Sequence, residues 1–387
     1  MAAVRRPPAA SSLIPPDWRS MQETIFITGA TGLVGSNLAN RLLHRRPEAT
    51  VVLLVRNRSS TTLHSLRRST RVQLVEGGLD HDGFHAGPSR DRKALTDRVT
   101  EIYHVAAETR FHAPWHELES INIEGTRRLI AFALECSKLR RFHHVSTAFV
   151  SGDRTGRILE EERDVGQAFS NGYEKSKLHA EAIFDEWQGI LPFTIYRPSI
   201  VAGDSRSGAT THFRGLYQIL KASFANLLPV VPGERSFPLD VVPVDFVCDA
   251  LLAIGSKTRS IGGTFHLTAG GKTRMPIGPM FDLWRERAAR HGITIQSPRF
   301  VPPHEFDSLA PRETRSVRLM QHLVPYLNQR TEFDRRKTEP YLADAGIPSV
   351  PFAAYYGNLI DFAIERSFGL RSAETESKDR SHSISSP

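Results

Sequence analysis

The sequence contains few cysteines and no long hydrophobic run. Only two cysteines, Cys136 and Cys248, occur among 387 residues, far apart and in apolar, helix-like surroundings. Two cysteines in a chain of this length do not make a disulfide framework, so we expect buried thiols in a reducing compartment. No apolar run approaches the roughly 18 residues that a transmembrane helix needs, and the N-terminus lacks the apolar stretch of a signal peptide. These absences favour a cytoplasmic protein without a transmembrane segment.

The pattern of charge argues against nucleic acid as a partner. The net charge of +8 favours anionic partners, but no block of basic residues interleaved with aromatics occurs. A phosphate-bearing cofactor or substrate is therefore favoured over nucleic acid.

His143 and His144 lie in a predicted strand and would point to opposite faces of a sheet, so we expect no metal site.

A glycine-rich stretch near the N-terminus carries the clearest local pattern. The apolar run 25–27 is followed by glycines with G-x-x-G-x-x-G spacing and then by a helical pattern, which is typical of a dinucleotide-binding loop. The first glycine suits a sharp turn, the second lets the backbone approach a pyrophosphate, and the third allows close packing of helix and strand. The helix N-terminus attracts the anion. The residues expected to bind the cofactor here are Thr28, Gly29, Thr31, Gly32, Leu33, Val34 and Gly35.

The end of the next predicted strand, residues 51–55, indicates which dinucleotide binds. In such a site an acidic residue at this position bonds the adenosine ribose, whereas a basic residue suits a 2′-phosphate. The sequence has Arg56 and Arg58 and no carboxylate here. It therefore favours NADP(H) over NAD(H).

Predicted strands alternate with helical patterns along the first two thirds of the chain. The strands are expected at residues 25–27, 51–55, 72–75, 101–107, 142–145, 193–196 and 264–267. This alternation predicts an α/β fold with a Rossmann-like, doubly wound parallel sheet, whose ligands lie beyond the carboxyl ends of the strands.

The same patterns suggest how the chain is divided. We expect an NADP-binding Rossmann domain over residues 21–205, completed by 240–270, and a smaller, mainly helical substrate-binding region over 206–239 and 271–370. Residues 1–20 and 371–387 are rich in polar and proline residues, and we expect them to be disordered.

A tyrosine and a lysine four residues apart predict acid–base chemistry. Tyr173 and Lys177 lie in a predicted helix over 173–187, on one face. A free tyrosine, with a pKa of about 10, is a poor acid–base group at pH 7, and we expect the neighbouring Lys⁺ to lower that pKa. The preceding predicted strand ends at Ser146 and Thr147, whose hydroxyl could bond a substrate oxygen. These groups together indicate a reductase.

With these motifs the chain resembles the extended short-chain dehydrogenase/reductases over about residues 22–270. The shared motifs are Thr28-Gly29-x-x-Gly32-x-x-Gly35, Val105-Ala106-Ala107, Ser146-Thr147-Ala148, Tyr173-x-x-x-Lys177 and Arg197-Pro198-Ser199-Ile200. Within that family, residues 107–111, 144–150 and 197–208 are similar to the fatty-acyl-CoA reductases and thioester reductases, the male-sterility-type group. The family usually has Gly-Asp-Leu where this chain reads Gly77-Gly78-Leu79, so an aspartate that would touch adenine is missing.

The resemblance implies roles for individual residues. It aligns Thr147 with the family's catalytic hydroxyl, beside Tyr173 and Lys177, and gives Lys177 a second role at the nicotinamide ribose. Asn122 is expected to be structural. Besides the glycine loop, the implied cofactor contacts come from Arg56, Arg58, Leu79, Ala106, Ala107, Pro198, Ser199 and Ile200.

The implied activity is that of an NADP(H)-dependent oxidoreductase of lipid metabolism, which reduces an acyl thioester of coenzyme A or a carrier protein to an aldehyde or alcohol. Arg110 and Arg206 could hold phosphates of the carrier arm. One alternative is an extended short-chain reductase or epimerase acting on a ketone, a hydroxysteroid-like compound or a nucleotide sugar. Another is a non-catalytic NADP-binding regulator, which the complete catalytic set disfavours. A homodimer and peripheral contact with membranes stay open.

Overall fold

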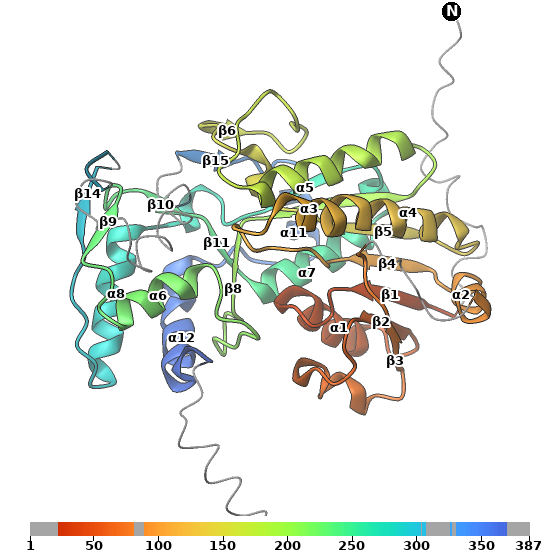
Figure 1. The fold of residues 1–387 in the computed structure, drawn as a ribbon, viewed down its shortest axis with the longest axis horizontal. Helices are drawn as coiled ribbons and strands as arrows, with labels where there is room; N and C mark the ends of the chain where they lie inside the picture. The colour runs from red at the N-terminus through yellow and green to blue at the C-terminus, as the bar shows by residue number, and fades with distance from the viewer. Residues whose placement is uncertain (1–21, 81–88, 303, 307–325, 327–329, 370–387) are drawn as a thin grey trace, which may run out of the picture.

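A seven-stranded parallel sheet with helices on both faces forms the centre of the computed structural model (Figure 1). The structure describes residues 22–80, 89–302, 304–306, 326 and 330–369. The segments predicted to be disordered, 1–20 and 371–387, therefore lie outside the described residues.

The central sheet confirms the predicted doubly wound fold. Its spatial order is β12-β7-β5-β4-β1-β2-β3, and every neighbouring pair is parallel. The order changes direction between β1 and β4, and ligands of such sheets bind outside this switch point. The strands are β1 (Thr24–Thr28), β2 (Thr50–Val55), β3 (Val72–Glu76), β4 (Glu101–His104), β5 (Arg141–Val145), β7 (Phe193–Pro198) and β12 (Thr264–Leu267).

The strand predicted over residues 101–107 ends earlier than expected, at His104. The backbone N–H groups of Val105 and Ala106 both donate to Oγ1 of Thr28, at 3.2 Å, instead of extending the strand. These two hydrogen bonds to Thr28 hold the segment after β4 against the turn after β1.

Amphipathic helices cover the two faces of the sheet (Figure 1). Leu38 and Leu42 of the first helix are fully buried among residues of β1 and β2, and burial of one leucine side chain contributes roughly 2 kcal/mol. One face is covered by α1 (Leu33–Arg45) and α7 (Val244–Gly255), the other by α4 (Gly125–Glu135) and α5 (Gly172–Ile183). Cys136 and Cys248 are buried and unbridged, as predicted.

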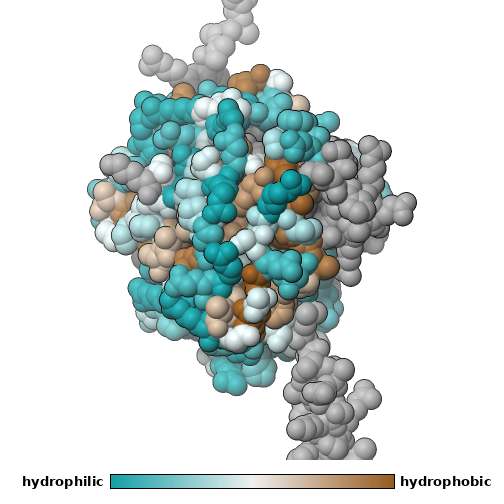
Figure 2. Space-filling view, turned by 90° about the vertical axis from the view of Figure 1, so that its left-hand side faces the viewer, coloured by the Kyte–Doolittle hydropathy of each residue, from teal (hydrophilic) through white to brown (hydrophobic). Residues whose placement is uncertain are grey.

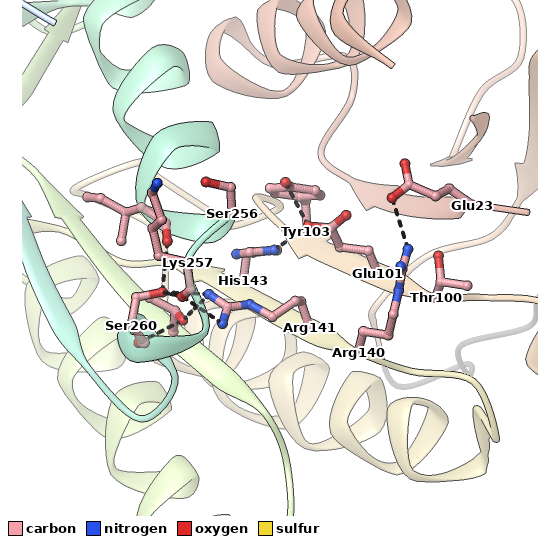
Figure 3. A network of polar contacts seen from close by, with 12 residues as sticks. Glu23, Thr100, Glu101, Tyr103, Arg140, Arg141, His143, Ser256, Lys257 and Ser260 are labelled. Atoms are coloured by element: carbon pink, nitrogen blue, oxygen red, sulfur yellow. Dashed lines mark hydrogen bonds and ion pairs between the residues drawn. The ribbon is translucent and has the colours of Figure 1, made fainter. Parts of the chain in front are cut away.

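A buried polar network joins the amino ends of neighbouring strands (Figure 3). Glu101, the first residue of β4, accepts hydrogen bonds from Nε2 of His143 at 2.8 Å and from Oη of Tyr103 at 3.0 Å. It also pairs with Arg46 just after α1. Burial alone would raise the pKa of Glu101, but Arg46 and His143 together hold that pKa below its usual value. The carboxylate is therefore charged and fully partnered inside the fold.

Short strand pairs and further helices complete the chain. The pairs are β8 (Ile200–Ala202) with β11 (Val241–Pro243), β6 (Gly156–Ile158) with β15 (Thr331–Phe333), β9 (Val230–Pro232) with β14 (Arg299–Val301), and β10 (Pro238–Leu239) with β13 (Met275–Pro276). The remaining helices are α2 (Ser89–Thr96), α3 (Trp115–Leu118), the π-helical segment η5 (Glu119–Glu124), α6 (Leu216–Phe224), α8 (Ile277–Arg290), α11 (Glu339–Asp344) and α12 (Phe352–Glu365).

The C-terminal region has an apolar core of its own. Trp284 of α8 is fully buried with Leu220 of α6 and Leu359 of α12. The region is mainly helical, as predicted, but β13, β14 and β15 were not predicted. These strands are only two or three residues long and pair with strands distant in the sequence, so no local periodicity predicts them.

The end of the molecule formed by the C-terminal region is mostly hydrophilic, with apolar residues visible in patches between polar ones (Figure 2). Among the described residues, no helix combines the length and the apolar character needed to cross a membrane.

Candidate active site

The turn between β1 and α1 has the shape of a phosphate-binding loop. Gly29 has a φ of +74°, and a Cβ there would lie 2.6 Å from the backbone N of Ala106. A Cβ on Gly35 would lie 2.2 Å from the Gly29 carbonyl oxygen, so α1 can pack this closely only with glycine. Gly32 precedes α1, whose first turn carries no acidic residue. The loop and the helix N-terminus thus offer backbone N–H groups to an anion, which fits a dinucleotide pyrophosphate.

Basic side chains follow β2, as the sequence indicated. The guanidinium groups of Arg56 and Arg58 are both exposed. Arg58 lies 3.5 Å from a carboxylate oxygen of Glu76 and donates to the Leu74 carbonyl at 3.1 Å. This edge of the sheet can therefore present positive charge to a ligand that reaches past β2.

The chain after β3 has a carboxylate close to the position where the family's aspartate is missing. A Cβ on Gly78 would lie 3.1 Å from Oδ1 of Asp80. Leu79 is buried in the core beside Gly125, and its carbonyl accepts a hydrogen bond from Arg128 at 2.9 Å. The side chain of Leu79 thus anchors this loop, and its contact with a cofactor stays a prediction.

Thr147 and Tyr173 come together beyond the carboxyl end of β5. Thr147 has extended backbone angles, and its Oγ1 accepts from the backbone N–H of Phe149 at 3.3 Å, which starts a 3₁₀ turn. Tyr173 lies in the first turn of α5, where Asn171 caps the helix by accepting from the N–H of Glu174 at 3.1 Å. The Thr147 hydroxyl lies close enough to the Tyr173 phenol to lower the pKa of that phenol. The hydroxyl groups of Thr147 and Tyr173 therefore lie close together beyond the carboxyl end of β5.

The expectation that Lys177 lowers the pKa of Tyr173 is wrong for the structure described here. Burial raises the pKa of Tyr173 to about 12, and the nearby Thr147 hydroxyl offsets this only in part. Lys177 does not contribute because its Nζ donates to the carbonyl of Val145 at 2.9 Å, away from the phenol. At neutral pH the phenol is protonated and can donate a hydrogen bond.

Lys177 lies one helical turn below Tyr173 in a fully buried position. Its Nζ lies 3.4 Å from Nε2 of His144, and burial lowers its pKa to about 8. The Nδ1 atom of His144 is buried and has no hydrogen-bond partner among the described residues. His143 points to the opposite face, toward Glu101, as the alternation along a strand requires.

A chain of buried hydrogen bonds, which the sequence did not reveal, starts at the glycine loop. Oγ1 of Thr126 donates to the carbonyl of Asn122 at 2.6 Å, so it accepts from Nε2 of His104 at 3.0 Å. The Nδ1 atom of His104 then accepts from Oγ1 of Thr28, also at 3.0 Å. Burial lowers the pKa of His104 to about 3, so the ring is neutral and this arrangement is fixed.

The same chain continues to the helix that carries Tyr173. Nδ2 of Asn122 donates to Oγ of Ser176 at 2.8 Å, and Ser176 donates to the Tyr173 carbonyl at 2.8 Å. Asn122 also bonds the backbone N–H and carbonyl of Glu108, in keeping with the structural role expected for it. His104 lay inside the strand predicted over residues 101–107, and its partners lie 22 and 76 residues away.

The other predicted cofactor residues gather at the same edge of the sheet. Ala106 and Ala107 follow β4 and are partly exposed. Pro198, Ser199 and Ile200 join β7 to β8, and the Ser199 side chain is nearly buried. These residues, Thr147 and the glycine loop all follow the carboxyl ends of strands, where the doubly wound sheet accepts ligands.

Of the two arginines expected to hold phosphates, Arg110 is already paired. It bonds Glu108 at 3.0 Å and also contacts Glu117, so its charge is balanced within its own loop. The side chain of Arg206 is exposed, and its phosphate contact stays a prediction.

Aromatic residues near Tyr173 were not recognised from the sequence. The Phe111 ring lies 6.1 Å from that of Tyr173 and stacks on Tyr326 at 5.1 Å. The Tyr326 hydroxyl donates to Glu174 at 2.5 Å and accepts from Asn171 at 2.9 Å. Because these rings come from segments more than 150 residues apart, only the fold brings them together.

Comparison with known families matches residues 27–251 to the NAD-binding family described as male sterility protein. The matched segment begins in β1 and ends in α7. It therefore contains the glycine loop, Thr147 and the whole of α5.

Among curated proteins, the chain is similar to synthetases and to reductases. It is 28% identical over 281 residues to the nonribosomal peptide synthetase asaC of Aspergillus flavus, covering 65% of this chain and 27% of that protein. It is 25% identical over 328 residues to the putative fatty acyl-CoA reductase CG8303 of Drosophila melanogaster, covering 70% of this chain and 59% of that protein. The chain thus spans only part of the length of these relatives.

Solved structures share the fold over most of the chain. The terminal R domain from the myxalamid PKS-NRPS biosynthetic pathway is 25% identical, with a TM-score of 0.75, and covers 94% of this chain and 98% of its own. A UDP-glucuronic acid 4-epimerase from Bacillus cereus in complex with NAD is 18% identical, with a TM-score of 0.64, over 88% of this chain and 98% of its own; that likeness shows the fold alone. Because the family model matches more than half of its length, the chain belongs to the male sterility protein family of NAD-binding domains.

Proposed function

We propose that this protein is an NADPH-dependent reductase of acyl thioesters in which Thr147, Tyr173 and Lys177 form the catalytic set. The observation that carries the proposal is the pairing of the Thr147 and Tyr173 hydroxyls beyond β5, one helical turn above the buried Lys177. Family membership supports an oxidoreductase of this type. The named reductases among the relatives support the choice of substrate.

The proposed cofactor site uses the glycine loop for the pyrophosphate and the residues after β2 for the adenosine end. Arg56 and Arg58 would hold the 2′-phosphate, which favours NADPH over NADH. At the other end, Lys177 would bond the nicotinamide ribose, and Pro198, Ser199 and Ile200 would flank the ring. NADPH, when bound, supplies the hydride that reduces the substrate carbonyl.

The two hydroxyls stabilise the charge that develops on the substrate oxygen. Because the phenol of Tyr173 is protonated at neutral pH, it donates to the oxyanion and then gives up its proton, while Thr147 holds the oxygen in place. The resulting hemithioacetal loses its C–S bond and leaves an aldehyde and a thiol. A second reduction of the aldehyde would give the alcohol.

The substrate is proposed to be an acyl group on coenzyme A or on a carrier protein. Both carry a phosphate-bearing pantetheine arm, which suits a chain with a net charge of +8. Arg206 is exposed in the loop after β8 and is the arginine proposed to meet these phosphates.

Turnover with defined thioesters tests the proposal. Purified protein is incubated with NADPH and octanoyl-CoA or palmitoyl-CoA, and loss of the nicotinamide absorbance is followed together with release of free thiol. Equal amounts of NADPH consumed and thiol released are expected for reduction to the aldehyde, and two NADPH per thiol for the alcohol. A parallel panel contains a ketosteroid and a nucleotide sugar. Activity in that panel and none with any thioester would replace the proposed substrate class.

A further inference from the structure

A small cavity lies beside the proposed catalytic hydroxyls. It measures about 10 Å³, about the room that one water molecule needs. Phe149, two residues after Thr147, and Ile200, directly after Ser199, form part of its wall. The cavity therefore adjoins both the proposed oxyanion site and the proposed nicotinamide site. Its other walls include Asp240, Arg274 and Phe333.

The carboxyl group of Asp240 forms one side of this cavity. Asp240 follows β10, and its Oδ1 accepts from the backbone N–H of Ala269 at 2.7 Å. Burial raises the pKa of Asp240 above its usual value, and the nearby Ser199 hydroxyl is buried without a hydrogen-bond partner among the described residues. This one backbone donor leaves acceptor capacity of Asp240 unused, because a carboxylate has about four lone-pair sites.

An arginine with an unused donor forms another side. Nη1 of Arg274 donates to the carbonyl of Thr331 at 2.7 Å, which fixes the guanidinium against β15. Its Nε atom is buried and has no hydrogen-bond partner in the part of the chain that the structure describes. A buried N–H without an acceptor costs roughly 1–3 kcal/mol, so a ligand that accepts this bond would gain affinity.

The chemistry of the two groups selects one kind of ligand. A methylene group would leave both Asp240 and Arg274 unsatisfied. An ammonium could donate to Asp240 but would face the guanidinium with like charge and offer Nε no lone pair. A hydroxyl is no larger than the cavity, donates to the carboxylate and accepts from Nε–H.

We propose that Asp240 and Arg274 form a subsite for a hydroxyl substituent on the acyl group, close to the thioester carbonyl. The inference rests on the proposed function and narrows its substrate class to hydroxyacyl thioesters. Because the two polar groups come from different walls of the cavity, the subsite distinguishes the two configurations of a hydroxyl-bearing carbon.

Binding and turnover are measured separately, so that failure of the subsite and failure of the proposed function are distinguishable. Isothermal titration without NADPH compares octanoyl-CoA with the two enantiomers of 3-hydroxyoctanoyl-CoA and with 2-hydroxyoctanoyl-CoA. We expect one hydroxyacyl-CoA to bind at least about 10-fold more tightly than octanoyl-CoA, since bonds to charged groups are the stronger ones. NADPH consumption with the same compounds then tests the proposed function.

Two variants test whether the preference for hydroxyacyl-CoA over octanoyl-CoA depends on this cavity. Asp240→Asn keeps the shape of the side chain and removes its charge, and Arg274→Met removes the Nε donor. Each is expected to bring the ratio of hydroxyacyl to acyl affinity close to one. The control is Asp282→Asn on α8. It removes an exposed carboxylate that pairs with Arg235 and is expected to leave the ratio of hydroxyacyl to acyl affinity unchanged. If one variant does not fold by circular dichroism, the other still decides.

Equal affinity of the wild-type protein for all four thioesters would overturn the subsite, because an ordered water would then satisfy the two groups. A preference that persists in both variants would also overturn it. Tight, selective binding without NADPH consumption would support the subsite and remove the proposed reaction.

Discussion

The two ends of the central sheet contain buried polar groups of very different kinds. At the amino ends, Glu101 is bonded by His143 and Tyr103 (Figure 3) and also pairs with Arg46. Nε of Arg141 at this end has no partner among the described residues. At the carboxyl ends, polar atoms without a partner among the described residues include Nδ1 of His144 and Oγ1 of Thr268.

The difference shows which end is built for stability and which for ligands. A buried group that is fully bonded within the protein contributes to the fold and has nothing left to offer a ligand. Unused donors and acceptors cost stability and persist where a ligand can satisfy them. The network around Glu101 therefore stabilises the sheet at its amino ends, and the proposed site lies at the carboxyl ends.

The largest expected effect is on stability, from the amino end. Glu101→Ala would leave Arg46 and His143 without their carboxylate, and we expect unfolding to become easier by about 3–5 kcal/mol. Urea denaturation measures this change. The control is Glu135→Ala, which removes an exposed partner of Arg92 and should cost under about 1 kcal/mol. Equal losses in the two variants would contradict the structural role of the buried network.

At the carboxyl end, Tyr173→Phe is expected to change function and leave the fold intact. Loss of the phenolic proton donor should lower turnover by a factor on the order of 10² or more, while NADPH binding is kept. Steady-state rates and a fluorescence titration with NADPH measure the two quantities. Near-normal turnover would remove Tyr173 as the acid.

The relative affinity for NADPH and NADH tests the proposed role of the exposed arginines after β2. Arg56→Glu places a carboxylate at the proposed 2′-phosphate site, and we expect NADPH affinity to fall by roughly 10- to 100-fold. NADH, which lacks this phosphate, should be little affected. Comparable losses for the two cofactors would refute the proposed contact.

The smallest expected effect is a change of stability with pH. Burial lowers the pKa of Lys177 from 10.5 to about 8, so the unfolded chain binds this proton more tightly than the folded one. The charged lysine therefore costs stability below pH 8, and the cost shrinks as the pH rises from about 8 toward 10.5.

Lys177→Met removes that cost together with the proposed catalytic ammonium. We expect the variant to be inactive yet more stable than the wild type at pH 7, with the difference smaller by about 1–2 kcal/mol at pH 9–10. Thermal melts across this range provide the comparison. A stability difference that does not change with pH would contradict the lowered pKa, because it would show that folding does not shift the pKa of Lys177.

Much of the fold could be predicted because its signals are local. The apolar run before Gly29 and the spacing of the next glycines predicted a strand, a turn and a helix, and all three are present. Tyr173 and Lys177 were predicted to share a helical face because four residues make about one turn, and both lie in α5.

The errors and omissions concern contacts between distant segments. The pKa of Tyr173 was predicted to fall because Lys177 is close in sequence, whereas burial by the surrounding fold raises it. Thr28, His104 and Thr126 form one hydrogen-bonded chain although no local pattern connects them. Asp240 and Arg274 share a cavity but were assigned from the sequence to different regions, 240–270 and 271–370.

The sequence by itself determined the strands of the central sheet and the helices between them, the phosphate-binding turn and the residues that follow these strands. These depend on backbone preferences and on periodicity within a few residues. Only the tertiary structure decided which buried groups are partnered, which keep a free donor or acceptor, and how burial moves their pKa values. Those properties depend on which segments meet in space, and desolvation is a property of the packed fold and not of any one stretch of chain.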